Sequence, residues 1–275
     1  MLLDEPRMTA FRDAIDQVVE PGNHVVDLGT GTGVLSFFAA RRGARVTAVE
    51  REPRVLAAAR QALAGVGDQV RLVHADARDY LPDEPVDVVL CEMMHVGQLR
   101  ERQVEVIDSF KRRYAERFGD QLPRFVPEAC VQAAQPVAQD FSYLGYTVAA
   151  PVFQEPYTVQ PRTTELAGPQ VFQRYFYRDP LPPRCTGDLR FTAARAGRLN
   201  AVRIITKNLL AVRLAPPSSV DWLMSYLVAP LTEPVEAAEG DEVRIRFDYR
   251  PGDEIDALTG SLRADVAAYA GSAGR

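Results

Sequence analysis

The chain has 275 residues, of which 47% are hydrophobic and 25% charged, and its formal net charge is −5. These values are typical of a globular protein with one large core or two smaller ones, and the negative charge argues against wholesale nucleic-acid binding. Three cysteines are too few for a disulfide framework, and we find no signal-peptide pattern and no apolar run of membrane-spanning length. We therefore expect a cytoplasmic protein that does not enter a membrane.

The first elements in chain order are a helix and then a strand, turn, helix, strand unit. Residues 1–20 predict one helix, which a Pro-Gly pair ends. An apolar run from His24 then ends on Asp27, and after a turn come a helical segment and a second apolar strand that ends on Glu50. In the turn, three alternating glycines let the backbone approach a ligand closely: Gly29, Gly31 and Gly33.

Two ligand classes fit this unit. One is a dinucleotide whose pyrophosphate lies at the helix N-terminus, and the other is S-adenosylmethionine, whose aminoacyl end lies near the glycines. In both, Glu50 can accept hydrogen bonds from two ribose hydroxyls. A structural turn without a ligand is the remaining alternative. The string Asp27-Leu28-Gly29-Thr30-Gly31-Thr32-Gly33 resembles the first motif of class I S-adenosylmethionine-dependent methyltransferases.

A second helix and a third strand come next, over Pro53–Leu63 and Val70–Val73. Asp76 follows this strand, and an acid at that position of a nucleoside-binding sheet can accept a hydrogen bond from the adenine amino group. The alternative is that Asp76 only caps its own turn. The sequence supports both interpretations.

The fourth strand, Val86–Leu90, ends where open α/β sheets place their active sites. Glu92 follows this strand, and Glu101 lies nine residues later, near the start of a helix expected over residues 98–118. Such a loop can aim both carboxylates into one pocket, where they repel unless a cation lies between them. A guanidinium is the best match, because its planar fork pairs with carboxylates bidentately. Taken alone, the spacing fits two purely structural acids equally well.

The sequence pattern changes at residues 122–127. Before it, strands alternate with helices, which predicts an α/β domain with a Rossmann-like, doubly wound parallel sheet over residues 1–125. After it, apolar runs broken by prolines predict an antiparallel β-barrel-like or sandwich domain over residues 126–275. The runs expected as strands are Cys130–Ala134, Val171–Tyr177, Leu189–Ala193, Ala201–Ile205, Leu209–Leu214, Trp222–Ala229, Glu242–Tyr249 and Ala257–Ala264.

Beyond the glycine motif, the chain resembles the protein arginine methyltransferase family over nearly its full length. Asp4-Glu5-Pro6-Arg7 is similar to the family's segment before its first helix, so the resemblance implies that Arg7 holds the cofactor carboxylate. Glu50 matches the family's ribose acid, and Glu92 and Glu101 match its double-Glu loop at the same separation. Three later segments resemble the start of the family's barrel, its Thr-His-Trp loop over the substrate and a late turn: Phe125–Glu128, Ser218–Trp222 and Glu239–Val243.

The resemblance implies an S-adenosylmethionine-dependent N-methyltransferase that acts on a guanidino nitrogen of arginine in a protein, in a peptide or as the free amino acid. Glu92 and Glu101 are then the catalytic residues, which orient the guanidinium and stabilise its charge, and no metal is expected. Two alternatives remain. One is a methyltransferase for a small-molecule or natural-product acceptor on the same scaffold, and the other is a non-catalytic scaffold subunit that binds the cofactor.

Three features depart from the family pattern. The sequence shows no counterpart of the family's tyrosine-bearing helix, which folds over the cofactor. Asp221 replaces the histidine of the Thr-His-Trp loop, and it repels the acid at Asp4 unless one of the two is protonated or a cation lies between them. The stretch between the first strand of the second domain and Val171 looks short for the family's helical dimerisation arm, and residues 145–161 show no clear helical pair. A homodimer is therefore compatible with the sequence without being required by it.

His95 stands where the double-Glu loop usually has a small residue. Together with Asp221 and Trp222 it is a candidate to line the substrate pocket. The alternatives are a loop histidine without a role and a tryptophan that only fills the core of the barrel.

Overall fold

A computed structural model describes residues 2–267. The first part of the chain forms a parallel five-stranded sheet of order β3-β2-β1-β4-β5. The strand order reverses between β1 and β4, which pair directly, and in such sheets the ligand lies at the carboxyl ends of the strands on either side of this point. The five strands are β1 (His24–Leu28), β2 (Arg45–Glu50), β3 (Val70–His74), β4 (Val88–Cys91) and β5 (Arg124–Val126).

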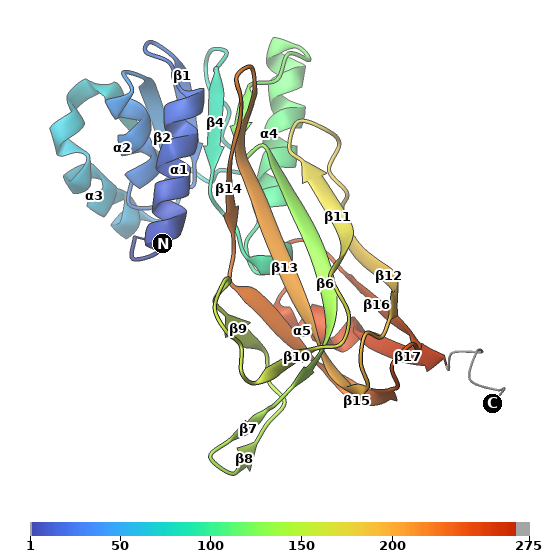
Figure 1. The fold of residues 1–275 in the computed structure, drawn as a ribbon. Coiled ribbons are helices and arrows are strands. Elements are labelled where there is room, and N and C mark those ends of the chain that lie inside the picture. Colours follow the sequence, from blue (N-terminus) through green and yellow to red (C-terminus); the bar gives the residue numbers. More distant parts are fainter. Residues whose placement is uncertain (1, 268–275) are drawn as a thin grey trace, which may run out of the picture.

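Helices cover both faces of the parallel sheet (Figure 1). Successive strand residues point to opposite faces of the sheet. Val25 therefore packs with helices α1 and α2 on one face, and Val26 packs with the buried side of helix α4 on the other. Asp4 caps the first helix by accepting a hydrogen bond from the backbone N–H of Arg7. The helices are α1 (Glu5–Val18), α2 (Val34–Arg41), α3 (Pro53–Ala62) and α4 (Gln103–Phe118), with short 3₁₀ turns η1 (Ala64–Gln69) and η2 (Val96–Gln98).

The second part of the chain is antiparallel, as the run of short apolar segments predicts. A seven-stranded sheet is built around one long strand, β13, and a three-stranded sheet packs beside it. A separate two-stranded hairpin extends away from both sheets (Figure 1). The large sheet contains β6 (Ala129–Gln139), β9 (Val152–Gln154), β10 (Thr163–Glu165), β11 (Gln170–Phe176), β13 (Gly197–Leu214), β14 (Pro217–Leu223) and β15 (Tyr226–Ala237). The small sheet contains β12 (Cys185–Thr192), β16 (Glu242–Tyr249) and β17 (Arg263–Ala267), and the hairpin is β7 (Ser142–Tyr143) with β8 (Tyr146–Thr147).

Three sequence expectations for this part need correction. The strand expected over Trp222–Ala229 is divided between two strands, because β14 ends at Leu223 and β15 begins at Tyr226. The strand expected over Ala257–Ala264 is a short helix, α5 (Ile255–Ser261), followed by β17. Leu258 within α5 and Leu262 directly after it are both buried, and their spacing of four residues fits a helix as well as a strand. The two strands expected at Ala201–Ile205 and Leu209–Leu214 are one continuous strand, β13, because pairing with β6 continues through residues 206–208, of which Thr206 and Asn208 are buried.

The hydrophobic core is continuous between the parallel and antiparallel parts. One cluster joins Val26 and Phe110 of the parallel part with Ile204 and Tyr249 of the antiparallel part. A second joins helix α1 with Trp222 and its neighbours. Because the two parts share a core, side chains from both can reach one site. None of the helices that the structure describes combines the length and the apolarity needed to cross a bilayer.

Candidate active site

A cavity of about 680 Å³ lies at the carboxyl edge of the parallel sheet, where the strand order reverses. Its volume is in the range that holds a nucleoside-sized ligand. The glycine turn after β1, the ends of β2 and β3, and the loop after β4 all contribute lining residues. Five acids that sequence analysis selected line it together: Asp27, Glu50, Asp76, Glu92 and Glu101.

The glycine turn owes its shape to Asp27, which lies almost fully buried beneath it. The carboxylate of Asp27 accepts hydrogen bonds from the hydroxyls of Thr30, at 2.6 Å, and Ser36, at 2.7 Å. Burial raises the pKa of Asp27, while the two hydroxyl donors oppose that rise. Gly31 has a φ of +58°, and a Cβ there would meet no atom within 4 Å, so its face toward the cavity is open.

Glu50 lies at the end of β2 and is held in place by backbone donors. One carboxylate oxygen accepts a hydrogen bond from the Gly31 N–H at 3.0 Å, and the other accepts from the Glu52 N–H at 2.8 Å. Each oxygen keeps a further lone pair for a ligand. The structure thus places Glu50 on the cavity wall with its orientation already fixed.

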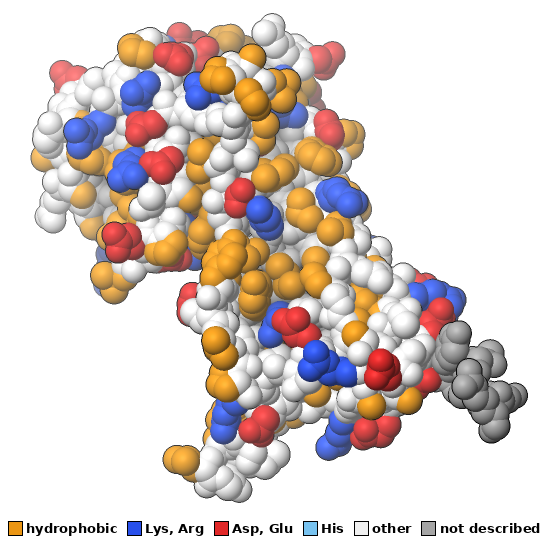
Figure 2. Space-filling model, in the orientation of Figure 1, with side chains coloured by type: hydrophobic (Ala, Val, Ile, Leu, Met, Phe, Trp, Pro, Cys, Tyr) orange, Lys and Arg blue, Asp and Glu red, His pale blue; other side chains and the backbone are white. Residues whose placement is uncertain are grey.

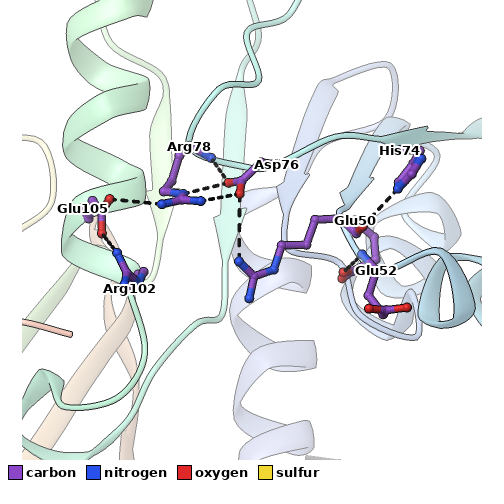
Figure 3. A network of polar contacts seen from close by, with 8 residues as sticks. Glu50, Glu52, His74, Asp76, Arg78, Arg102 and Glu105 are labelled. Atoms are coloured by element: carbon purple, nitrogen blue, oxygen red, sulfur yellow. Dashed lines mark hydrogen bonds and ion pairs between the residues drawn. The ribbon is translucent and has the colours of Figure 1, made fainter. Parts of the chain in front are cut away.

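Asp76 is held by Arg78, which sequence analysis did not single out (Figure 3). The Arg78 side chain donates to both oxygens of Asp76, at 3.0 and 2.7 Å, and its backbone N–H donates as well. These bonds lower the pKa of Asp76 to about 2. Arg78 continues to Glu105 of α4 at 3.6 Å. Asp76 therefore caps its own turn and also lines the cavity, and its predicted hydrogen bond to the adenine amino group stays a prediction.

Glu92 is the most deeply buried of the two loop acids, and its partner is Arg7. The Arg7 Nη1 atom lies 3.3 Å from the Glu92 Oε1 atom, and the Arg7 Nε atom lies 3.1 Å from a carboxylate oxygen of Asp4. The Glu92 side chain is 12% exposed. Burial raises its pKa from an ordinary value of 4.5 to about 7, with Arg7 acting in the opposite direction and Glu101 in the same one.

Trp222 and Asp221 lie side by side in sequence but have different surroundings. The Arg7 guanidinium lies over the Trp222 ring, 4.4 Å from its centroid, which is a cation–π contact. Asp221 pairs instead with Lys207, on the adjacent strand β13, at 3.1 Å. Each of the two acids expected to repel one another therefore has a cationic partner of its own: Arg7 pairs with Asp4, and Lys207 pairs with Asp221.

Glu101 reaches the same cavity as Glu92 from the other end of their loop. Its side chain is exposed, in contrast to that of Glu92. His95, between them, lies elsewhere: its ring meets Phe153 of β9 edge-on, at 5.7 Å between centroids, and it is not among the residues that line the cavity. Burial lowers its pKa. The loop brings its two acids together and turns its histidine away.

Several residues that shape this site were missed at the level of sequence. Met93 packs its thioether against Gly29, where a Cβ would come within 3.1 Å of the Met93 side chain. Gln103 accepts a hydrogen bond from the Met93 backbone N–H at 2.9 Å, directly beside Glu92. Met93 lies within the double-Glu loop and Gln103 just after it, but nothing in the loop pattern marks either one. Only Arg78 carried a sequence signal, because it stands two residues after an aspartate, the spacing of an Asx turn.

Comparisons with known proteins agree with this geometry. Residues 25–116 match a methyltransferase domain family. An uncharacterised protein of Methanothermobacter thermautotrophicus is 32% identical over 263 residues, which is 95% of each chain. A probable protein arginine N-methyltransferase 6 of Arabidopsis thaliana is 35% identical over 127 residues, covering 45% of this chain and 29% of the plant protein. The solved Trypanosoma brucei PRMT1 enzyme–prozyme heterotetramer with AdoHcy superimposes with a TM-score of 0.70 at 18% identity, covering 90% and 85% of the two chains.

The chain is a class I methyltransferase that resembles the protein arginine methyltransferases in fold and, over part of its length, in sequence. Its cofactor is S-adenosylmethionine. The residues present fit that group: an open glycine turn meets a pre-oriented acid at Glu50, as a ribose needs, and the cavity continues to Glu92. Arg7 contacts Glu92 at this far end, and its predicted role at the cofactor carboxylate stays a prediction.

Proposed function

We propose that this methyltransferase acts on the guanidino group of arginine. The observation that carries the proposal is that two carboxylates of one loop, Glu92 and Glu101, line the cofactor cavity together. A guanidinium matches such a pair in charge and in its planar donor geometry. One guanidinium, that of Arg7, already pairs with Glu92 in the structure, which supports this match.

The chain's own residues supply orientation and charge. Bound S-adenosylmethionine offers a methyl carbon on a sulfonium, and transfer forms a bond from the acceptor nitrogen to that carbon as the carbon–sulfur bond breaks. Glu92 and Glu101 hold the acceptor in line and draw its positive charge away from the attacking nitrogen. The acceptor nitrogen loses one proton during transfer. Glu92, with a pKa of about 7, is suited to receive it.

The direct test is incubation with methyl-labelled S-adenosylmethionine and two acceptor pools, arginine-rich peptides and free arginine, with products identified by mass spectrometry. We expect labelled methylarginine from at least one pool. Label transfer that never reaches a guanidino nitrogen, in an enzyme that binds the cofactor by calorimetry, would refute the proposal.

A second candidate is transfer to a small-molecule amine on the same scaffold. The observation that favours it is the ion pair between Asp221 and Lys207, which stands where the family has a histidine. A different charge arrangement on this loop suits a different acceptor. A methylated product without a guanidino group, in a reaction with an extract of small metabolites, would favour this candidate.

We further propose that two copies of the chain pair through the β7–β8 hairpin. Its exposed side chains are strongly apolar: Leu144 is fully exposed, and Tyr146 is 68% exposed. Hydrophobic atoms lie at the tip of this projection (Figure 2). Exposed apolar groups gathered on a projection are typical of association surfaces, and the related trypanosomal protein is a heterotetramer.

A further inference from the structure

The loop that carries Glu92 and Glu101 is held at its midpoint by two side chains of the antiparallel part. Gly97 lies five residues after Glu92 and four before Glu101. The backbone N–H of Gly97 donates to the Thr206 hydroxyl at 2.8 Å, and the Tyr249 hydroxyl donates to the Gly97 carbonyl at 2.7 Å. Both polar groups of one peptide residue are therefore fixed by side chains that come from two different sheets, on β13 and β16.

The surroundings of these two hydroxyls hold them in place. Thr206 is completely buried and donates its proton to Gln132 at 2.6 Å, so its oxygen is left to accept from Gly97. Tyr249 is 1% exposed. A Cβ at Gly97 would come within 3.2 Å of the Tyr249 hydroxyl, so glycine is needed for this close approach.

The loop contains three residues with a left-handed backbone, two of which carry side chains. Gly97, Gln98 and Arg100 have φ values of +71°, +56° and +61°, a region that side-chain-bearing residues seldom occupy. Strained residues of this kind are kept in place by their surroundings. The surroundings here are again the antiparallel part: the Gln98 carbonyl accepts from the Gly252 N–H, and the Arg100 N–H donates to the Asp253 carbonyl.

We infer that Thr206 and Tyr249, which we call the hydroxyl pair, are positioning residues for the methyl transfer. They touch neither acid. By fixing Gly97 they fix the span between Glu92 and Glu101, and hence the separation at which the two carboxylates meet an acceptor. The catalytic part of this inference rests on the proposed function, because it takes Glu92 and Glu101 as the acids that hold the acceptor.

The test compares Thr206→Val and Tyr249→Phe with two controls. Thr206→Ser keeps the hydroxyl, and Tyr175→Phe removes another buried barrel hydroxyl, one that contacts Cys185 rather than the loop. We expect both test variants to lose about tenfold to 100-fold in kcat, because small misplacements of a catalytic group have effects of this size. Cofactor affinity should stay within about twofold of wild type, and both controls should keep wild-type activity.

A second readout does not depend on the acceptor. Hydrogen–deuterium exchange over residues 92–101 should speed up at both ends of the loop in the two test variants and stay unchanged in the controls. Unaltered exchange near Glu92 and Glu101 overturns the inference, as does kcat equal to that of Tyr175→Phe. If wild type yields no methylarginine, the proposed function fails, and the exchange result alone decides whether the hydroxyl pair positions the loop.

Discussion

Glu92 and Glu101 occupy opposite ends of one loop and differ in burial, and we expect both to be indispensable. Glu92→Gln and Glu101→Gln should each lower kcat/KM by about 100-fold or more, because each removes charge stabilisation of the acceptor cation. Cofactor affinity, measured by calorimetry, should change little. Asp108→Asn, an exposed acid of α4 outside the cavity, is the matched control. Near-normal transfer by either glutamine variant would contradict the assignment.

The burial of Glu92 also predicts how the rate depends on pH. Because its pKa is raised to about 7, a large share of Glu92 is protonated below that pH and cannot attract a cationic acceptor. We expect kcat/KM for the acceptor to rise across about pH 6 to 8 and then level off. A steady-state pH series with a saturating cofactor measures this. A flat or falling profile over that range would show that Glu92 is not the group that must ionise.

The raised pKa of Glu92 also makes the stability of the fold depend on pH: stability falls as the pH rises, whereas the expected rate increases. The folded carboxyl titrates near 7 and an ordinary one near 4.5, so its contribution to stability is present in full below about 4.5 and is lost as the pH rises through about 7. Glu92→Gln has no carboxyl to ionise, so its stability does not fall over this pH range. Arg7 still has Asp4 as an ion-pair partner in this variant. At pH 8 the variant should gain about 1 kcal/mol, with an upper bound of about 3.

Denaturant unfolding at pH 5 and pH 8 measures this gain. Most of it should be gone at pH 5, which is only slightly above the ordinary pKa of 4.5 and where the folded carboxyl is still neutral. The exposed Glu101→Gln should show no comparable gain at either pH. A Glu92→Gln protein that is less stable than wild type at pH 8 would mean that its pairing with Arg7 outweighs the cost of its burial.

The sequence predicted the acids of the site better than their partners. Glu50 and Glu92 stand at strand ends in the chain, so their place at the edge of the sheet follows from the pattern of elements. The contact between Arg7 and Trp222 joins helix α1 to strand β14 and depends on how the two parts of the chain pack. Lys207 faces Asp221 only because of the register between β13 and β14, which no local pattern reveals.

At the scale of elements, the turn between β1 and α2 is built on a buried carboxylate that depends on two hydroxyls. We expect Thr30→Val to lower the free energy of unfolding by about 1–3 kcal/mol, because Asp27 then loses a donor while it stays buried. The turn should also loosen and weaken cofactor binding. Thr30→Ser, which keeps the hydroxyl, should retain both properties in denaturant unfolding and calorimetry. Equal behaviour of the two variants would show that Ser36 alone suffices.

The alternating first half of the chain could be predicted element by element, and the second half only in kind. The helix expected over Pro53–Leu63 is observed as α3, because its start and end have strong local signals. The antiparallel half lacks such signals. Its apolar runs show which segments are buried. They do not distinguish a short helix such as α5 from a strand, because the two have similar composition over so few residues. The division of the chain at residues 125 and 126 stays a prediction.

At the scale of the whole molecule, the apolar hairpin leads to a prediction about assembly. Leu144→Asp should shift the protein toward the monomer in light scattering at micromolar concentration, because it places a charge on the fully exposed tip of the β7–β8 hairpin. The fold should be unaffected, since this side chain packs against nothing. Val159→Asp, an equally exposed apolar residue outside the hairpin, is the control. An unchanged mass for Leu144→Asp would exclude the hairpin as the contact.

The position of Gly97 between the two halves has a consequence for how this enzyme can be altered. Its loop belongs to the parallel half by sequence, whereas the two hydroxyls that fix it belong to the antiparallel half. A chimaera that receives a foreign second half at Val126 would carry a native loop without its matching supports. A chimaera designed for a new acceptor must therefore take residues 92–101 and the strands that carry Thr206 and Tyr249 from the same parent protein.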